Sequence, residues 1–137
     1  MSLIAPLLQT SHAFAIVGAS QDRTKYGYEV FEALTQHRHT VLPINPKYTD
    51  IDGVICYPSL PDLPHNPDVV LTAAPAAVSE QIARTCAALG ISIFWMPPGT
   101  ETDVALEICK QNNVTAIHGF CPVFLLKLPR ERWVDLP

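Results

Sequence analysis

Short runs of apolar, often β-branched residues alternate along the chain with longer segments in which apolar residues recur every three or four positions. The short runs span residues 13–17, 40–44, 69–73, 91–95 and 114–118. Near-continuous apolar runs of this length are typical of parallel strands that are buried on both faces. The longer segments, residues 28–37, 78–89 and 103–112, have the spacing of amphipathic helices. We therefore expect five strands that alternate with helices.

The ends of the helical segments carry residues that favour helix termini. Ser79 or a neighbour is a candidate N-cap of the second helix, and Gly90 follows the last periodic position of that helix. Thr102 opens the third helix after two prolines and a glycine. Residues 52–68 contain four prolines, so we expect mostly irregular chain there, with a short turn at 59–63 in place of a crossover helix.

The order of these elements predicts the fold class. Alternating strands and helices with right-handed crossovers form a doubly wound parallel sheet. We expect a single α/β domain over residues 1–137, with a Rossmann-like sheet of about five strands, helices on both faces and a core at about 13–124. A short helix at 3–9 precedes this core. The tail at 130–137 contains Trp133 and covers either the sheet edge or a partner.

The composition narrows the class of protein. Apolar residues make up 48% of the chain and charged residues 16%, which is typical of a globular protein with a core of its own. The net charge of −4 gives no general attraction to nucleic acids or anionic membranes, so we expect neither as a partner. No apolar stretch approaches the ~18 residues of a spanning helix, and the first residues lack the pattern of a secretory signal. We expect a cytoplasmic protein.

The cysteines and histidines do not have the spacing of a metal site, so we expect no bound metal and four reduced thiols. Cys121 follows His118 by three residues near the end of the last strand. One interpretation makes Cys121 a nucleophile and His118 its base. The other interpretation, which we favour, is that Cys121 ends the strand while His118 is partly buried and hydrogen-bonded. Under this interpretation no residue is assigned a catalytic role.

The loop after the first strand is the first candidate for a binding site, because open parallel sheets bind ligands at the carboxyl ends of their strands. It reads Gly18-Ala19-Ser20. The small residues allow the backbone to approach a pyrophosphate, and a helix N-terminus near Tyr26 adds a favourable dipole. The loop matches neither G-x-G-x-x-G nor the P-loop pattern, so a strand-to-helix turn without a ligand is the alternative.

The loop after the second strand reads Asn45-Pro46-Lys47. An NAD enzyme has an acidic residue here, which accepts hydrogen bonds from the ribose hydroxyls. A lysine only donates, and it suits a phosphate on the ribose or a diphosphate. Lys47 therefore disfavours NAD and leaves coenzyme A (CoA), with its 3′-phosphate, and NADP, with its 2′-phosphate, as candidate ligands. A solvated loop lysine is the alternative.

Several segments match a known pattern when they are taken together and in order. They are residues 14–20, 25–27, 41–47, 53–60 and 121–122. This set resembles the CoA-binding domain family, similar to the CoA-binding domains of the succinyl-CoA synthetase α subunit and of ADP-forming acyl-CoA synthetases. The resemblance extends over residues 13–124.

The resemblance implies positions for the ligand. It places Gly18, Ala19, Ser20, Lys25 and the helix start at Tyr26 around the CoA phosphates, Asn45, Pro46 and Lys47 beside the adenosine, and Pro75 and Gly99 along the groove towards the pantetheine. In the related ligases a further domain supplies a phosphorylated histidine. We therefore expect this chain to bind CoA or acyl-CoA without catalysis, as a carrier or sensor that acts on an unknown protein partner.

Alternative functions use the same site. One is an NADP-dependent enzyme, and another is a thiol enzyme based on Cys121, each with an unknown substrate. A further hypothesis is a mixed disulfide between Cys121 and the CoA thiol, which would make the protein a redox-responsive carrier. The apolar composition and the Trp133-containing tail are also compatible with a homodimer.

Overall fold

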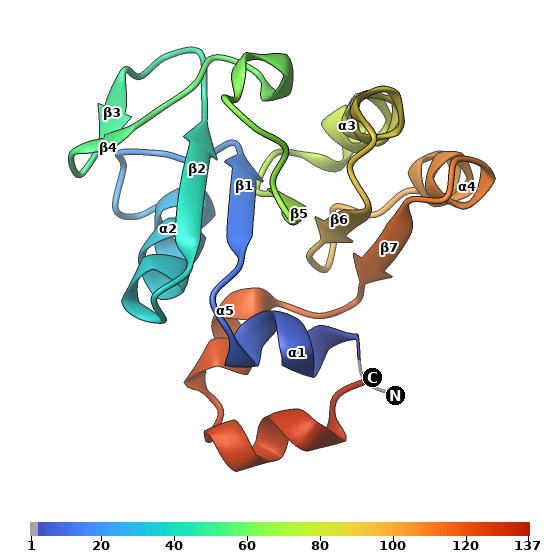
Figure 1. The fold of residues 1–137 in the computed structure, drawn as a ribbon. Coiled ribbons are helices and arrows are strands. Elements are labelled where there is room, and N and C mark those ends of the chain that lie inside the picture. The colour runs from blue at the N-terminus through green and yellow to red at the C-terminus, as the bar shows by residue number, and fades with distance from the viewer. Residues whose placement is uncertain (1–2) are drawn as a thin grey trace.

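Five parallel strands form the centre of the computed structural model, which describes residues 3–137 (Figure 1). They are β1 (Ala13–Val17), β2 (Thr40–Ile44), β5 (Val69–Thr72), β6 (Ile93–Met96) and β7 (Thr115–His118). Their order in the sheet is β2-β1-β5-β6-β7, so the direction in which strands are added reverses between β1 and β5. The predicted α/β fold with a doubly wound five-stranded sheet is confirmed, and each strand begins and ends within two residues of its predicted run.

Helices cover both faces of the sheet. On one face lie α1 (Ile4–Gln9), α2 (Tyr26–Gln36) and α5 (Pro122–Lys127), and on the other lie α3 (Ala76–Leu89) and α4 (Asp103–Gln111). Successive residues of β1 point into different cores: Phe14 and Ile16 pack with α1 and α2, whereas Ala15 packs with α3. The strands are therefore apolar on both faces, as their sequences predict.

The helix ends confirm two of the three expected signals. Thr102 Oγ1 accepts a hydrogen bond from the Ala105 amide at 3.0 Å, and Gly90 ends α3 in the left-handed conformation with φ 74°. The prediction of an N-cap at Ser79 is wrong, because α3 begins three residues earlier, directly after Pro75. Proline has a φ that suits a helix start. Ser79 instead lies inside the helix and donates to the Thr100 carbonyl at 2.6 Å.

The chain between β2 and β5 is mostly irregular, as expected, with a 3-10 turn at Leu60–Asp62. It also contains a small antiparallel hairpin that was not predicted, with strands β3 (Asp50–Ile51) and β4 (Val54–Ile55). The turn residues Asp52 and Gly53 both have positive φ values, 49° and 82°. Asp-Gly is a strong hairpin signal, but two-residue strands are too short to show an alternating pattern.

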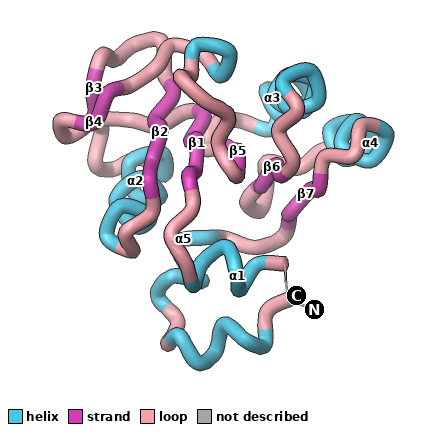
Figure 2. The backbone as a smooth tube through the Cα atoms, viewed as in Figure 1, coloured by secondary structure: helices cyan, strands magenta, loops and turns pink. Residues whose placement is uncertain are grey.

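The two ends of the described chain lie side by side (Figure 2). The backbone amides of Leu3 and Ile4 donate to the Pro137 carbonyl, each at 3.2 Å. The tail forms a 3-10 helix, Arg130–Asp135, in which Trp133 is buried and donates its indole N–H to the Leu125 carbonyl at 2.8 Å. Trp133 thus packs into the protein's own core. Within residues 3–137, no helix is long and apolar enough to cross a membrane.

Candidate functional site

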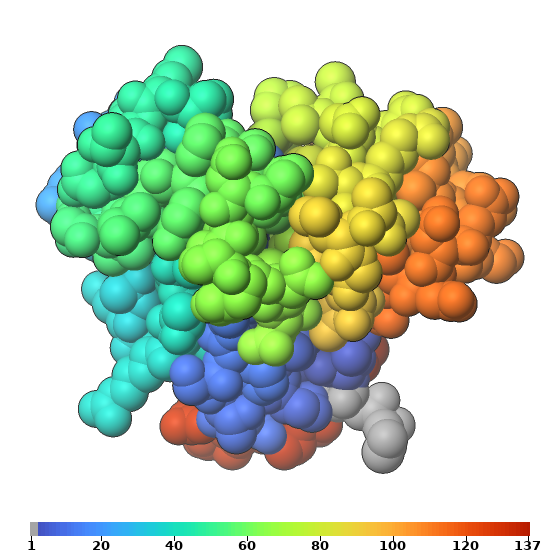
Figure 3. Space-filling view, turned by 45° about the horizontal axis from the view of Figure 1, so that its top comes forward, coloured from blue at the N-terminus to red at the C-terminus, as the bar shows by residue number. Residues whose placement is uncertain are grey.

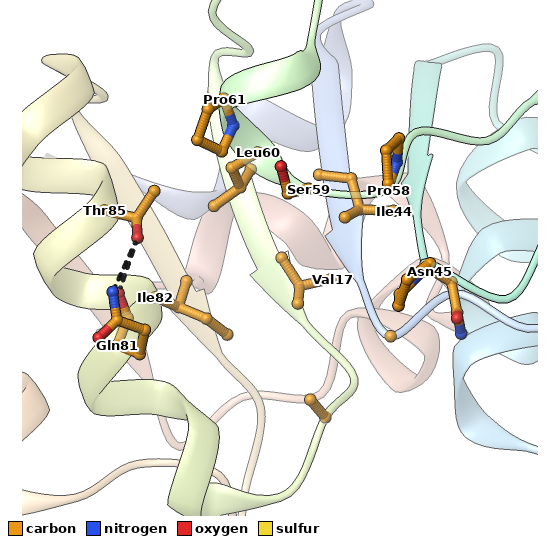
Figure 4. Close-up of a pocket in the computed structure, with 13 residues that line it drawn as sticks. Val17, Ile44, Asn45, Pro58, Ser59, Leu60, Pro61, Gln81, Ile82 and Thr85 are labelled. Carbon is orange, nitrogen blue, oxygen red and sulfur yellow. Dashed lines mark hydrogen bonds between the residues drawn. The ribbon is translucent and has the colours of Figure 1, made fainter.

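A pocket of about 330 Å³ opens at the carboxyl ends of β1 and β5, where the strand order reverses. Its lining comes from the loops after β1 and β2, from residues 58–61 and from one face of α3 (Figure 4). Figure 3 shows the groove from outside, between the green segment that follows β2 and the yellow-green α3. Doubly wound sheets bind their ligands at this point of the fold. We refer to this cavity as the switch-point pocket.

Two glycines allow close backbone contacts at the loop after β1: Gly18 lets this loop approach the loop after β5, and Gly27 lets the start of α2 approach Gly18. Gly18 has φ 88°, and a Cβ there would lie 3.1 Å from the backbone of Ala73 and Ala74. A Cβ on Gly27, in the first turn of α2, would overlap the carbonyl oxygen of Gly18. Only residues without a side chain allow this approach. The helix N-terminus is therefore held directly beside the loop that borders the pocket.

The start of α2 is suited to an anion. Lys25 precedes the helix, and no side chain caps its first amides. Lys25 and Lys47 are both exposed. Among residues 3–137, the only ion pairs are Arg23 with Asp52 and Arg84 with Glu80, so neither lysine forms a salt bridge. A carboxylate that does interact with Lys25 is that of Asp22, whose pKa is lowered mainly by hydrogen bonds from Thr24 and in smaller part by the Lys25 charge. Uncapped helix amides and unpaired cations are the groups that bind phosphates.

The predicted residues of the first two loops have different roles in the structure. Gly18, Asn45 and Pro46 line the switch-point pocket. The Asn45 amide joins the two loops, because its Nδ2 donates to the Ala19 carbonyl at 2.9 Å and its Oδ1 accepts from the Lys47 amide at 2.9 Å. Ser20, in contrast, is buried, and its hydroxyl accepts from the Asp22 amide at 3.0 Å.

A second pocket, of about 460 Å³, adjoins the first and shares Ala74 with it. It is lined by Tyr26, Ala73, Ala74, Pro75, Pro97, Pro98, Thr100 and Cys121. Of the predicted residues, Pro75 is on its wall, while Gly99 lies in the same loop as Pro98 and Thr100 but does not line it. No charged side chain contributes to the lining. This apolar pocket is suited to an uncharged, flexible group.

Cys121 lines the apolar pocket, and it is the one of the four cysteines that is not buried. Its thiol lies 3.5 Å from the Tyr26 hydroxyl, and burial together with this contact raises the pKa of Tyr26, which keeps the phenol protonated. The other cysteines are buried in the cores. Burial raises the pKa of Cys86 to about 12, and it also raises the pKa values of Cys56 and Cys109.

The structure does not bring His118 and Cys121 into one site. His118 is exposed, so the expectation that it is partly buried is wrong, and its ring forms no hydrogen bond with another described residue. It lines a separate hollow with Leu3 and Phe120. No group of three potential metal ligands occurs within the described part of the chain.

The α3 wall of the switch-point pocket was not predicted from the sequence. Gln81, Ile82 and Thr85 line it from this helix. Their only sequence signal is a polar pair at positions i and i+4, which is also typical of a solvent-facing helix surface. The residues 58–61 opposite them lie in the segment predicted as irregular chain with a turn at 59–63, and no ligand contact was assigned to them.

Comparisons with known proteins agree with this geometry. A family model described as the CoA binding domain matches residues 12–127. The chain is 34% identical over 77 residues to an ADP-forming acetate–CoA ligase of Methanocaldococcus jannaschii, covering 56% of this chain but only 11% of the ligase. It is 24% identical over 118 residues to the uncharacterized protein YneT of Bacillus subtilis, covering 86% of this chain and 87% of YneT.

Solved structures show the same fold. A conserved hypothetical protein from Pyrococcus furiosus is 32% identical, with a TM-score of 0.78, and the match covers 82% of this chain and 97% of that one. A hypothetical protein from Pyrococcus horikoshii has a TM-score of 0.85 at 24% identity, covering 96% of this chain and 89% of that one. These similar chains are close to this one in length, whereas the chain spans about a tenth of the M. jannaschii ligase.

Proposed function

This chain belongs to the CoA binding domain family, and from this premise we propose that it binds CoA or an acyl-CoA without chemistry of its own, as a carrier or sensor module. The observation that carries the proposal is the sequence of environments along one edge of the sheet. A pocket next to an uncapped helix and unpaired lysines continues into an uncharged pocket. CoA has the same order of groups, with an anionic nucleotide followed by an uncharged arm.

The phosphates have partners at the junction of the two pockets. We assign the diphosphate to the loop of Gly18, Ala19 and Ser20, the first turn of α2 at Tyr26, and Lys25. The Gly18 amide donates to the Ile44 carbonyl at 3.0 Å, so the loop amides assigned to the diphosphate are those of Ala19 and Ser20. This assignment is supported by the close packing of α2 on the loop, which lets helix amides and backbone reach the same anion. Backbone donors that are already in place lose little entropy on binding.

The adenosine and the arm then extend in opposite directions from the phosphates. Asn45 and Pro46 border the switch-point pocket, and we assign the adenosine to it, with Lys47 on the 3′-phosphate. The pantetheine arm passes Ala74 and Pro75 and enters the apolar pocket beside the loop that contains Gly99. Its amides and methylenes suit a wall without charges.

An NADP-dependent enzyme has less support from this site. Hydride transfer to most substrates also requires a group that moves a proton. The polar side chains on the apolar pocket are those of Tyr26, Thr100 and Cys121, and the raised pKa of Tyr26 makes it a poor base. A thiol enzyme that uses His118 as its base has no support, because His118 lies elsewhere.

The position of Cys121 favours a different thiol chemistry as the second candidate function. In this candidate, the Cys121 thiolate attacks the disulfide of an oxidised CoA dimer, forms one protein–CoA disulfide and releases one CoA thiol. The reaction needs the arm to end in the apolar pocket, where Cys121 is located. It would make the carrier responsive to the redox state of the CoA pool.

The test is a calorimetric titration of the reduced protein with CoA, dephospho-CoA, NADP and NAD at one salt concentration. We expect CoA to bind most tightly. Lys47→Ala should weaken the binding of CoA by about 1–3 kcal/mol if the lysine contacts the 3′-phosphate, and it should weaken the binding of dephospho-CoA less. Lys110→Ala, which replaces an exposed lysine on α4, is the matched control and should change the affinity for neither ligand.

Two results would count against these assignments. Equal losses of affinity for CoA and dephospho-CoA in Lys47→Ala would contradict the assignment of Lys47 to the 3′-phosphate, but they would not contradict the proposed function. A wild-type protein that binds none of the CoA forms would contradict the proposed function itself.

A further inference from the structure

We propose that Gln81 and Thr85, one turn apart on α3, read the edge of the bound nucleotide base and select adenine over guanine. The inference rests on the CoA-binding function proposed above. It adds to that function the residues that determine base specificity, which the polar groups of the switch-point pocket single out.

The walls of the switch-point pocket suit the faces of a planar ring. Ile44 and Pro58 lie across the pocket from Ile82 on α3, with Leu60 above and Val17 at the base (Figure 4). The volume of about 330 Å³ is at the lower end of the range for small-molecule sites. A heterocyclic base that lies between such apolar walls needs polar partners only at its edge.

Most polar side chains of this pocket already have partners within the fold. The amide of Asn45 is used at both ends, by Ala19 and by the Lys47 backbone. The hydroxyl of Ser59 donates to Asp62 at 2.6 Å. Neither can turn to a base without breaking a contact that holds its loop. The polar side chains that remain on the lining are Gln81 and Thr85.

The geometry of this pair orients the Gln81 amide. The Thr85 hydroxyl donates its hydrogen to the Gln81 backbone carbonyl at 3.0 Å. A lone pair of the same oxygen therefore remains for the side-chain amide of Gln81. Gln81 Nε2 lies 3.5 Å from that oxygen, the dashed contact in Figure 4. This long contact is weak, and the Gln81 side chain is exposed. The amide keeps an acceptor oxygen and an N–H for a ligand.

An amide with a free acceptor and a free donor discriminates between the purines when it meets their N7 edge. Adenine offers the N6 amino group and the N7 acceptor side by side, which match the oxygen and the N–H of a glutamine. Guanine offers two acceptors, O6 and N7, at the same edge, and these leave the amide oxygen without a donor. Gln81 is thus the main reader, and Thr85 is a positioning residue that favours this orientation of the amide through its contact at 3.5 Å.

The experiment compares two probes that share their phosphates and differ only in the base: adenosine 3′,5′-bisphosphate and guanosine 3′,5′-bisphosphate. Calorimetric titration is carried out with wild type, Gln81→Met, Thr85→Val and the control Gln111→Met. Methionine keeps the length of glutamine without its polar groups. Gln111 is a suitable control because it occupies an exposed position on α4, where its amide donates to Glu107 one turn away.

We expect the wild type to prefer the adenine probe by about 5- to 100-fold, the range for a bidentate base contact. Gln81→Met should lose most of this preference because it weakens binding of the adenine probe, and Thr85→Val should lose part of the preference. Gln111→Met should keep the preference, and thermal melting should show all variants folded.

Failure of this inference can be told apart from failure of the proposed function. If wild type binds CoA but does not distinguish the two probes, or if Gln81→Met keeps the full preference, Gln81 does not read the base, and the inference is overturned while CoA binding stands. If wild type binds neither CoA nor either probe, the proposed function fails, and the inference fails with it.

Discussion

Replacing Gly27 by alanine tests the contact on which the whole phosphate site depends. The added Cβ would overlap the Gly18 carbonyl oxygen, and the two atoms have to separate by about 1 Å to reach a normal contact. The clashing group is backbone, so no side-chain rotation relieves it. The start of α2 and the loop after β1 must therefore move apart.

The expected cost follows from two opposing effects. Alanine is the better helix former by about 1 kcal/mol, whereas overpacking in a well-packed site costs typically about 1–3 kcal/mol. Because backbone has to move, we expect overpacking near the top of its range and a net loss of about 2 kcal/mol. For a domain of this size, this lowers the melting temperature by about 6 to 10 °C.

The assay combines thermal melting with CoA titration. A shift of about 1 Å in the helix start also displaces the amides that we assign to the diphosphate, so CoA affinity should fall at least about tenfold. Gly53→Ala is the control, because Gly53 has φ 82° but open space around its Cβ position. It should lose about 1 kcal/mol of stability and keep CoA affinity. Unchanged melting and unchanged affinity in Gly27→Ala would refute the close packing of α2 on the loop.

Two further predictions concern side chains outside the phosphate site. The pKa of His39 is below its ordinary value of 6.5, because burial disfavours the charged ring and His12 and His37 add like charge. The unfolded chain therefore binds more protons below about pH 6.5, and the free energy of unfolding should fall from pH 7 to pH 5, measured by urea denaturation, with a smaller fall in His39→Gln. In thiol titration of the native protein, Cys121 alone of the four cysteines should react fast with an aromatic disulfide, and desulfo-CoA should slow it. Rapid reaction of Cys121→Ser would show that another cysteine is the reactive one, and no protection by desulfo-CoA would place the arm of the ligand elsewhere.

Much of the fold could be predicted because its signals are local. Each of the five strands lies within a short, mostly apolar run, and Thr102 and Gly90 mark helix ends through their own conformations. The elements that were missed are short. The β3–β4 hairpin and α5 (Pro122–Lys127) have too few residues to show a period. They form because tertiary packing holds them, and such packing leaves little trace in sequence.

The site could be predicted on one side only, and the strand order explains why. Lys47 and Asn45 are recognisable because they directly follow a strand, and the carboxyl ends of parallel strands share one edge. Gln81 lies on a helix, and its place opposite Asn45 depends on α3 packing beside β1 and the loop after β2. That arrangement holds because β5 pairs with β1 on the side away from β2. With β5 next to β2 instead, the same helix would face another loop, and Gln81 would be one more solvated glutamine.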